Sequence, residues 1–206
     1  MKKVVFLIAA TLITSVAFAQ TVREELVPYD KANNYSGCAL EVPSGMDIKT
    51  VQGALQNRFE QVAKLKGSNS GGFRAYLAQP FPEFGMLNYD IYTKVAEVGK
   101  KKDKKTVVYL LVSKGNMNFA NSTTDPEIVT GMKTFLTDFV NFIKEYDTSL
   151  KIAEQEKLIA KLEKEEKSLI SDKEKLQKQL SGKETDITKK QEELQKAKEV
   201  LKSLRP

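Results

Sequence analysis

Histidine and tryptophan are both absent from this 206-residue sequence. Histidine is the commonest general base and a frequent ligand of transition metals, so its absence excludes a Ser–His–Asp triad and most transition-metal sites. A Gly-x-Ser-x-Gly element, a Walker-type loop and a dinucleotide-binding fingerprint are also missing. The glycine-rich run 67–72 lacks the Lys-Ser/Thr of a phosphate loop. We therefore expect a non-enzymatic protein without a cofactor or metal.

Carboxylates alone can hydrolyse sugars when two of them face each other across a cleft. The candidates are Glu41, Glu83, Asp90 and Glu97. Spacing along the chain does not show whether any two of them meet, so a carboxylate-dependent hydrolase stays a less favoured alternative.

Cys38 is the only cysteine, which excludes an internal disulfide. We interpret it as a small buried side chain in a strand, with an intermolecular disulfide as the alternative. The net charge is +6, and residues 151–206 contribute 15 basic against 12 acidic groups. The charge is unevenly divided, since two charges belong to residues 1–19 and the head is nearly neutral, and it is too weak to indicate a nucleic-acid partner.

Residues 1–19 have the pattern of a secretory signal peptide. Lys2 and Lys3 precede an apolar run, and Ala17-Phe18-Ala19 places small residues before Gln20, where we expect cleavage. The apolar run is too short to span a membrane, and no later segment approaches ~20 apolar residues. We therefore expect an exported bacterial protein, periplasmic or secreted, with no transmembrane segment in the mature chain.

Residues 20–148 predict one α+β head domain with a small antiparallel sheet in the order β-α-β-β-β-α. The predicted strands are 37–42, 73–79, 89–98 and 106–113, and the last three should form a meander. The almost continuously apolar 106–113 is the best candidate for a central strand of the sheet. Phe73, Ala75 and Leu77 should share one face of their strand. A helix capped by Ser44 or Asp47 should cover one face of the sheet, through Ile48, Val51, Leu55, Phe59 and Val62.

A second helix should begin at Asp125-Pro126-Glu127, where a capping carboxylate, a first-turn proline and an acid coincide. Its wide apolar stripe suits a sheet as far as Tyr146. Beyond Leu150 the stripe narrows to isolated Ile and Leu among Lys and Glu, which marks a domain boundary near 148. Residues 147–149 form a weak breaker, where we expect the helix either to bend or to run on to Leu180.

The tail, 149–206, predicts an antiparallel helical hairpin, a short intrachain coiled coil. Its apolar residues are mirrored about Ser181-Gly182, where glycine favours a bend. The predicted seam consists of Ile159, Leu162, Leu169, Leu176, Ile187, Leu194, Leu201 and Leu204. The competing arrangement uses this seam against another copy, giving a possible homo-oligomer.

Three surface segments suggest binding. The loop 79–87 carries Phe81 and Phe84, which either close the core or form an exposed partner patch. The turn 99–105 carries Lys100, Lys101, Lys102, Lys104 and Lys105, which either form a solvated tip or contact an anionic surface. The amide-rich loop 116–122 either stabilises turns or holds a small anion or sugar.

The sequence as a whole favours an exported interaction or scaffold protein, whose head docks and whose hairpin projects to an unknown envelope protein or anionic surface. A small-ligand or glycan-binding module, with the hairpin as a spacer, is the alternative.

Overall fold

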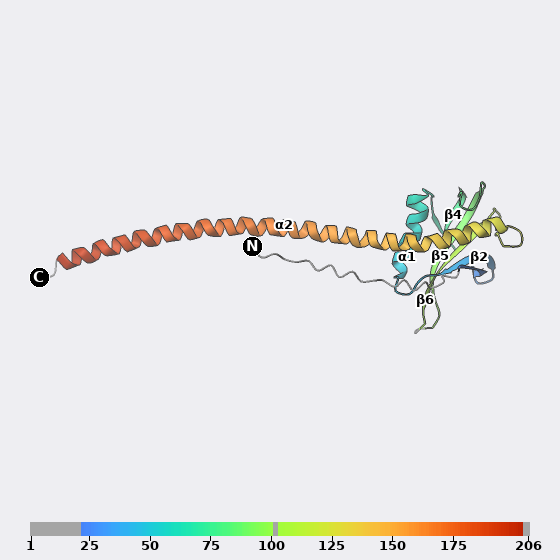
Figure 1. The fold of residues 1–206 in the computed structure, drawn as a ribbon, viewed down its shortest axis with the longest axis horizontal. Coiled ribbons are helices and arrows are strands. Elements are labelled where there is room, and N and C mark those ends of the chain that lie inside the picture. Colours follow the sequence, from blue (N-terminus) through green and yellow to red (C-terminus); the bar gives the residue numbers. More distant parts are fainter. Residues whose placement is uncertain (1–21, 101–102, 204–206) are drawn as a thin grey trace, which may run out of the picture. The chain divides into compact units, whose positions relative to one another are not determined.

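The computed structural model describes residues 22–100 and 103–203, and it shows an α+β protein (Figure 1). The predicted signal peptide, Lys101, Lys102 and Leu204 lie outside these ranges. The chain divides into two compact units between Thr148 and Ser149, which are described separately. Within the described ranges, no helix is both long enough and apolar enough to cross a membrane.

One six-stranded sheet forms the centre of the first unit, with the strand order β1-β2-β6-β5-β4-β3 and every neighbouring pair antiparallel. The strands are β1 (Val22–Pro28), β2 (Asn34–Glu41), β3 (Ser68–Ser70), β4 (Phe73–Pro80), β5 (Asn88–Val98) and β6 (Lys105–Ser113). The predicted meander is confirmed as β4-β5-β6. The almost continuously apolar β6 is interior, between β2 and β5.

The two edge strands were not predicted from the sequence. β1 carries Arg23, Glu24 and Glu25, and only Val27 within it is fully buried. Charged side chains on an edge strand discourage pairing with other molecules, but they remove the apolar alternation that identifies a strand. β3 has only three residues, all polar.

A bulge in β4 overturns the predicted facing of Leu77. The register against β5 shifts between Tyr76 and Gln79, and Ala78 adopts a φ of 52°. The backbone N–H of Ala78 then donates to the carboxylate of Asp90 over 2.8 Å. Phe73 and Ala75 are buried as predicted, whereas Leu77 is exposed.

The first helix, α1 (Ile48–Gln56), begins as predicted at Asp47, whose carboxylate accepts hydrogen bonds from the backbone of Lys49 and Thr50. It continues into η1 (Asn57–Val62), a wider π-helical turn. The wider turn breaks the regular helical spacing. Phe59 stays in the core, but Val62 is half exposed, contrary to the prediction.

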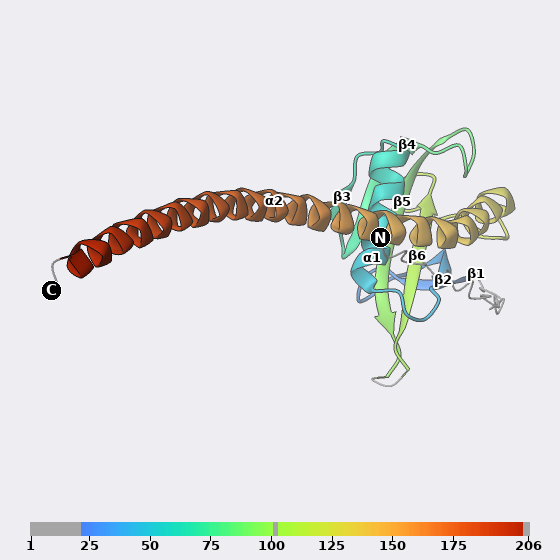
Figure 2. The same cartoon turned by 60° about the vertical axis from the view of Figure 1, so that its left-hand side comes forward.

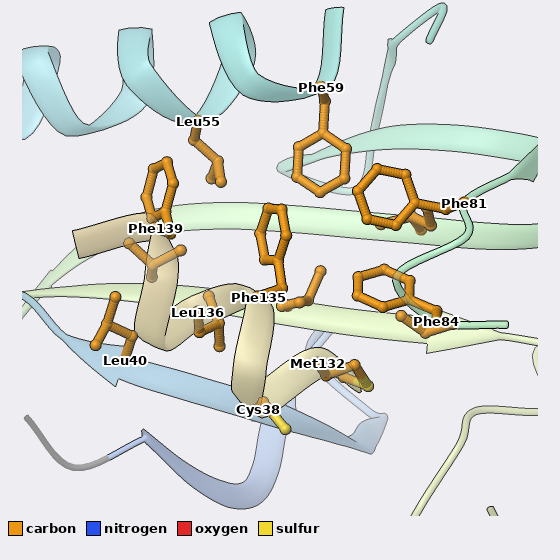
Figure 3. Close-up of a cluster of buried hydrophobic side chains, with 14 of the residues drawn as sticks. Cys38, Leu40, Leu55, Phe59, Phe81, Phe84, Met132, Phe135, Leu136 and Phe139 are labelled. Carbon is orange, nitrogen blue, oxygen red and sulfur yellow. The ribbon is translucent and has the colours of Figure 1, made fainter. Parts of the chain in front are cut away.

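The main core lies between the sheet and the two helices, α1 and the first turns of α2 (Pro126–Ser203), which cross the same side of the sheet (Figure 2). α2 starts at the predicted proline, and its wide apolar stripe is buried over Ile128–Ile143. The carboxylate of Asp125 was expected to cap the helix by accepting from backbone N–H groups of the first turn. It instead accepts hydrogen bonds from the side chains of Lys114 and Thr124. Aromatic rings fill the centre of this core (Figure 3).

A second, smaller core covers the opposite face of the sheet. Phe73, Tyr92 and Phe119 are buried there, with Tyr29 and Tyr35 at the margin. The ring of Tyr35 stacks on Phe119 at 4.3 Å between centroids, and Tyr29 stacks on Phe73 at 5.3 Å. The loops that follow β1 and β6 therefore close this face in place of a helix.

The predicted hairpin is wrong, because α2 continues through Ser181 and Gly182 to Ser203. The hydroxyl of Thr185 donates to the carbonyl of Ser181, four residues back, across the proposed bend. A glycine inside a helix costs only about 1 kcal/mol relative to alanine, whereas a turn forfeits several backbone hydrogen bonds. The residues around Gly182 are mostly Lys, Glu, Gln and Leu, which favour helix, and no proline lies among them, so the helix continues. The helix also runs through 147–149 without a break.

Candidate functional site

The most conspicuous surface of the second unit is an apolar stripe along α2. Its residues recur at two positions of a seven-residue repeat, called a and d, as in helices that pair in coiled coils. We call these residues the α2 seam. They are Ile152, Ile159, Leu180, Ile187, Leu194 and Leu201 at a, and Leu162, Leu169 and Leu176 at d.

Every residue of the α2 seam is exposed, with at least 52% of its surface accessible. Additional apolar residues border the seam at Leu158, Ile170 and Val200, and these are also about half exposed. Long stretches of exposed apolar surface usually mark a binding site, because burying them against a partner is favourable. The predicted seam residues that the structure describes, Ile159 to Leu201, thus share one heptad phase, but they do not meet one another within the described chain.

The rest of this helix surface is charged. Lys161 and Glu165, Lys175 and Asp172, and Lys190 and Glu193 form ion pairs along the helix. Such pairs contribute only a few tenths of a kcal/mol each. Lys161 and Lys175 lie on the outer face and their acidic partners border the seam, whereas Lys190 occupies a d position, so charge interrupts the apolar stripe there.

The head contains a cavity of ≈ 230 Å³ beside α1, β4 and β5. Gln52, Gln56, Arg74, Tyr76 and Thr93 are among its lining residues. The strands supply Arg74, Tyr76 and Thr93, and the outer face of α1 supplies the two glutamines.

An ion pair between Arg74 and Glu60, 2.6 Å long, organises the charge beside this cavity. Burial tends to raise the pKa of Glu60, but hydrogen bonds from Gln56 and Arg74 outweigh it and the pKa is lowered overall. Burial raises the pKa of Tyr76 to about 12, with a further contribution from the negative charge of Glu60. The Tyr76 hydroxyl has no hydrogen-bond partner among the described residues. The arrangement suits a small polar ligand and supplies no evident nucleophile.

Phe81 and Phe84 are buried, each only 3% exposed, so they do not form the predicted partner patch. Their rings contact one another at 4.6 Å between centroids and pack against Phe59 and Phe135 (Figure 3). The apolar side chains that this loop does expose are Met86 and Leu87. The phenylalanine rings of this loop therefore fill the end of the core, and its Met and Leu side chains remain at the surface.

The structure describes three of the five predicted lysines of the turn 99–105. Lys104 pairs with Glu97 at 2.5 Å and Lys105 pairs with Glu41 at 2.6 Å, whereas Lys100 uses its carbonyl to accept from Asp103. Two lysines are therefore partly neutralised by acids of neighbouring strands. Contact with an anionic surface stays a prediction.

Each of the four candidate catalytic carboxylates binds a different partner, and none of these partners is another candidate. Glu41 and Glu97 pair with the lysines just described, Glu83 pairs with Arg58 at 2.6 Å, and Asp90 accepts from Ala78. No hydrogen bond or ion pair between two of them occurs within the described residues. In that part of the chain there is also no cluster of three or more Cys, Asp or Glu side chains suited to a metal ion.

The amide-rich loop stabilises turns, as one of its two interpretations predicted. The side-chain oxygen of Asn121 accepts from the backbone of Thr123 and Thr124, and Phe119 is buried in the smaller core. Asn116 and Met117 have φ angles of 53° and 57°, which asparagine tolerates better than most residues. Ligand binding by this loop stays a prediction.

Cys38 is fully buried in β2, as predicted, and burial raises the pKa of its thiol to about 12. Sequence reasoning missed the cavity beside Arg74. Its polar lining residues come from three elements, and only the alternation of Arg74 and Tyr76 against Phe73 and Ala75 pointed toward it.

Comparisons of this chain with protein-family models, curated proteins and solved structures found no match.

Proposed function

We propose that this is a non-enzymatic interaction or scaffold protein, exported to the bacterial envelope, whose α2 seam pairs with a partner helix. The observation that carries the proposal is the exposed α2 seam, nine apolar residues in one heptad phase from Ile152 to Leu201. A helix of this composition has little to stabilise it alone, since most helical stability in proteins comes from packing of an apolar face. A partner helix supplies that packing through knobs-into-holes contacts.

In-cell photo-crosslinking tests this proposal. A photoreactive amino acid at Leu169, in the seam, should give covalent adducts, whereas the same group at Lys164, on the outer face, should give none. Mass spectrometry of the adducts identifies the partner. Absence of adducts from Leu169, and equally from Leu176 and Leu194, would contradict the proposal.

A second candidate function, binding of a small polar ligand or glycan by the head, is favoured by the cavity beside Arg74. Thermal-shift measurements with a panel of sugars and small carboxylates test it. Binding should raise the melting temperature of the parent, and Gln52→Ala should abolish that rise. Gln195→Ala, on α2 outside the cavity, is the matched control. No shift with any member of the panel would count against this candidate.

A further inference from the structure

The heptad phase of the α2 seam is unbroken across Gly182. The a row runs through Ile152, Ile159, Glu166, Lys173, Leu180, Ile187, Leu194 and Leu201. The d row runs through Gln155, Leu162, Leu169, Leu176, Lys183, Lys190 and Ala197. A hairpin would not require the a and d positions to continue at seven-residue spacing from one arm into the other. Its turn would allow the second helix to begin at any position of the heptad. One continuous phase is what a second, equally continuous helix requires.

Resting on the proposed function, we infer that the partner of the α2 seam is a second copy of this chain, aligned antiparallel, with residue n opposite residue 356 − n. The alignment places a positions of one helix against d positions of the other. The facing apolar layers are Leu176 with Leu180, Leu169 with Ile187, Leu162 with Leu194, and Ile159 with Ala197, each occurring twice in the dimer.

Charge complementarity within the seam favours this alignment over a parallel dimer and over the antiparallel alignment with residue n opposite 363 − n, in which Glu166 faces Ala197 and Lys173 faces Lys190. Glu166 lies opposite Lys190 of the second copy, an opposite-charge layer that the two-fold symmetry repeats. In a parallel, in-register dimer each residue faces its own copy, so Glu166, Lys173, Lys183 and Lys190 give four like-charge layers. The antiparallel alignment has only two, both between Lys173 and Lys183. Charges in a seam interact strongly because packing excludes water from them.

The positions beside the seam oppose the antiparallel alignment weakly. In an antiparallel pair the flanking side chains meet two residues away from the 356 − n rule, so two g residues face each other when their numbers sum to 358 and two e residues when they sum to 354. Glu165 therefore faces Glu193 of the second copy, and Asp172 faces Asp186. Glu156 faces Lys198 on the other side and compensates in part. These positions border solvent, where ion pairs and repulsions have small effects, so the seam layers dominate. In the single chain Lys190 pairs with the exposed Glu193, and its flexible side chain can turn instead to Glu166.

Charge reversal with rescue tests the alignment. Sedimentation equilibrium should show that Glu166→Lys weakens the dimer about tenfold or more, because two like-charge layers replace two opposite-charge ones. Lys190→Glu should do the same, and the double variant should restore dimerisation. Lys164→Glu, on the outer face, is the matched control and should leave it unchanged. Circular dichroism checks that each variant keeps its helix. Failure of the double variant to rescue would overturn the antiparallel alignment.

Spin-label distances on the full chain give a second, independent readout. Residue 164 lies opposite residue 192, so labels at position 164 in the two copies should be about 40 Å apart along the helix. Labels at position 178, where the copies cross, should be only about 20 Å apart, the width of two helices. A parallel dimer would give about 20 Å at both positions. Cys38 is fully buried, so the parent treated with the label serves as the background control.

A monomer at all concentrations, with no dipolar coupling between copies, would overturn the inference of a second copy. If photo-crosslinks from Leu169 then identify a different protein, the proposed function still holds. If they identify none, both fail.

Discussion

At the scale of single residues, two observations in the head give sharp predictions, and the first concerns Gly131. A Cβ added to Gly131 would lie 2.3 Å from the backbone carbonyl oxygen of Glu83, in the loop that follows β4. Backbone atoms cannot move aside as a flexible side chain can. Alanine improves helix propensity by at most about 1 kcal/mol, while overpacking costs about 1–3 kcal/mol.

Gly131→Ala should therefore lower the free energy of unfolding of the head by about 1–2 kcal/mol. Urea unfolding followed by tyrosine fluorescence measures this. An unchanged or higher stability would show that the loop carrying Phe81 and Phe84 is not packed against α2 as the structure has it.

The second residue-scale prediction concerns the ion pair between Glu60 and Arg74, whose side chains are 17% and 31% exposed. The pKa of Glu60 is lowered in the folded state from the usual 4.5. The folded state therefore gains stability from the carboxylate above pH 4.5, and loses it as the pH falls through the lower folded pKa.

Glu60→Gln should thus reduce the stability of the head by roughly 0.5–1 kcal/mol at neutral pH, allowing for partial solvent screening. The difference from the parent should shrink as the pH falls below 4.5 and through the lowered folded pKa of Glu60, because the carboxyl then becomes protonated and neutral like glutamine. Urea unfolding at several pH values checks this, with the exposed Glu145→Gln as control. A difference that persists in acid would mean that packing, not charge, sets the effect.

At the scale of elements, regular patterns along the chain predicted structure well and irregular ones did not. β5 and β6 have strong apolar patterns, and their existence and pairing, together with the interior place of β6, followed from the sequence. The π-turn η1 and the bulge at Ala78 each displace a side chain, Val62 and Leu77, from the face that a regular period assigns to it. Local irregularities of this kind leave no periodic signal, so their consequences are visible only in the structure.

The mirror symmetry about Gly182 misled for a different reason. Mirrored apolar positions are equally compatible with two arms of one chain and with two chains that run in opposite directions. The sequence alone favoured the first arrangement through the glycine. The unbroken helix removes that arrangement and leaves the second. In the alignment inferred above, the two chains pair one heptad away from this mirror, with residue n opposite 356 − n instead of 363 − n.

Gly182→Ala tests the continuity of α2 directly. A Cβ at Gly182 would meet no atom within 4 Å, and the residue is helical. Alanine should therefore raise the stability of the tail helix by about 1 kcal/mol. Thermal melting followed at 222 nm should move upward. A lower melting temperature would indicate a bend at this position, as the hairpin requires.

At the scale of the whole molecule, the two units should respond differently to protein concentration. Both cores of the head consist of residues up to Tyr146, so the head has buried cores of its own and we expect its folding to be independent of protein concentration. The tail from Ser149 to Ser203 has no buried residue of its own, and without a partner helix so polar a stretch is only marginally stable.

Melting of the full chain should therefore show two transitions. The tail transition, seen as loss of signal at 222 nm, should move to higher temperature as the protein concentration increases, because association stabilises the folded helix by mass action. The head transition, seen in the near-ultraviolet signal of its tyrosines, should not move. Glu166→Lys should lower the tail transition alone. A single transition independent of concentration would mean that the tail is held by something other than a second copy, since only self-association makes its stability depend on how much of the chain is present.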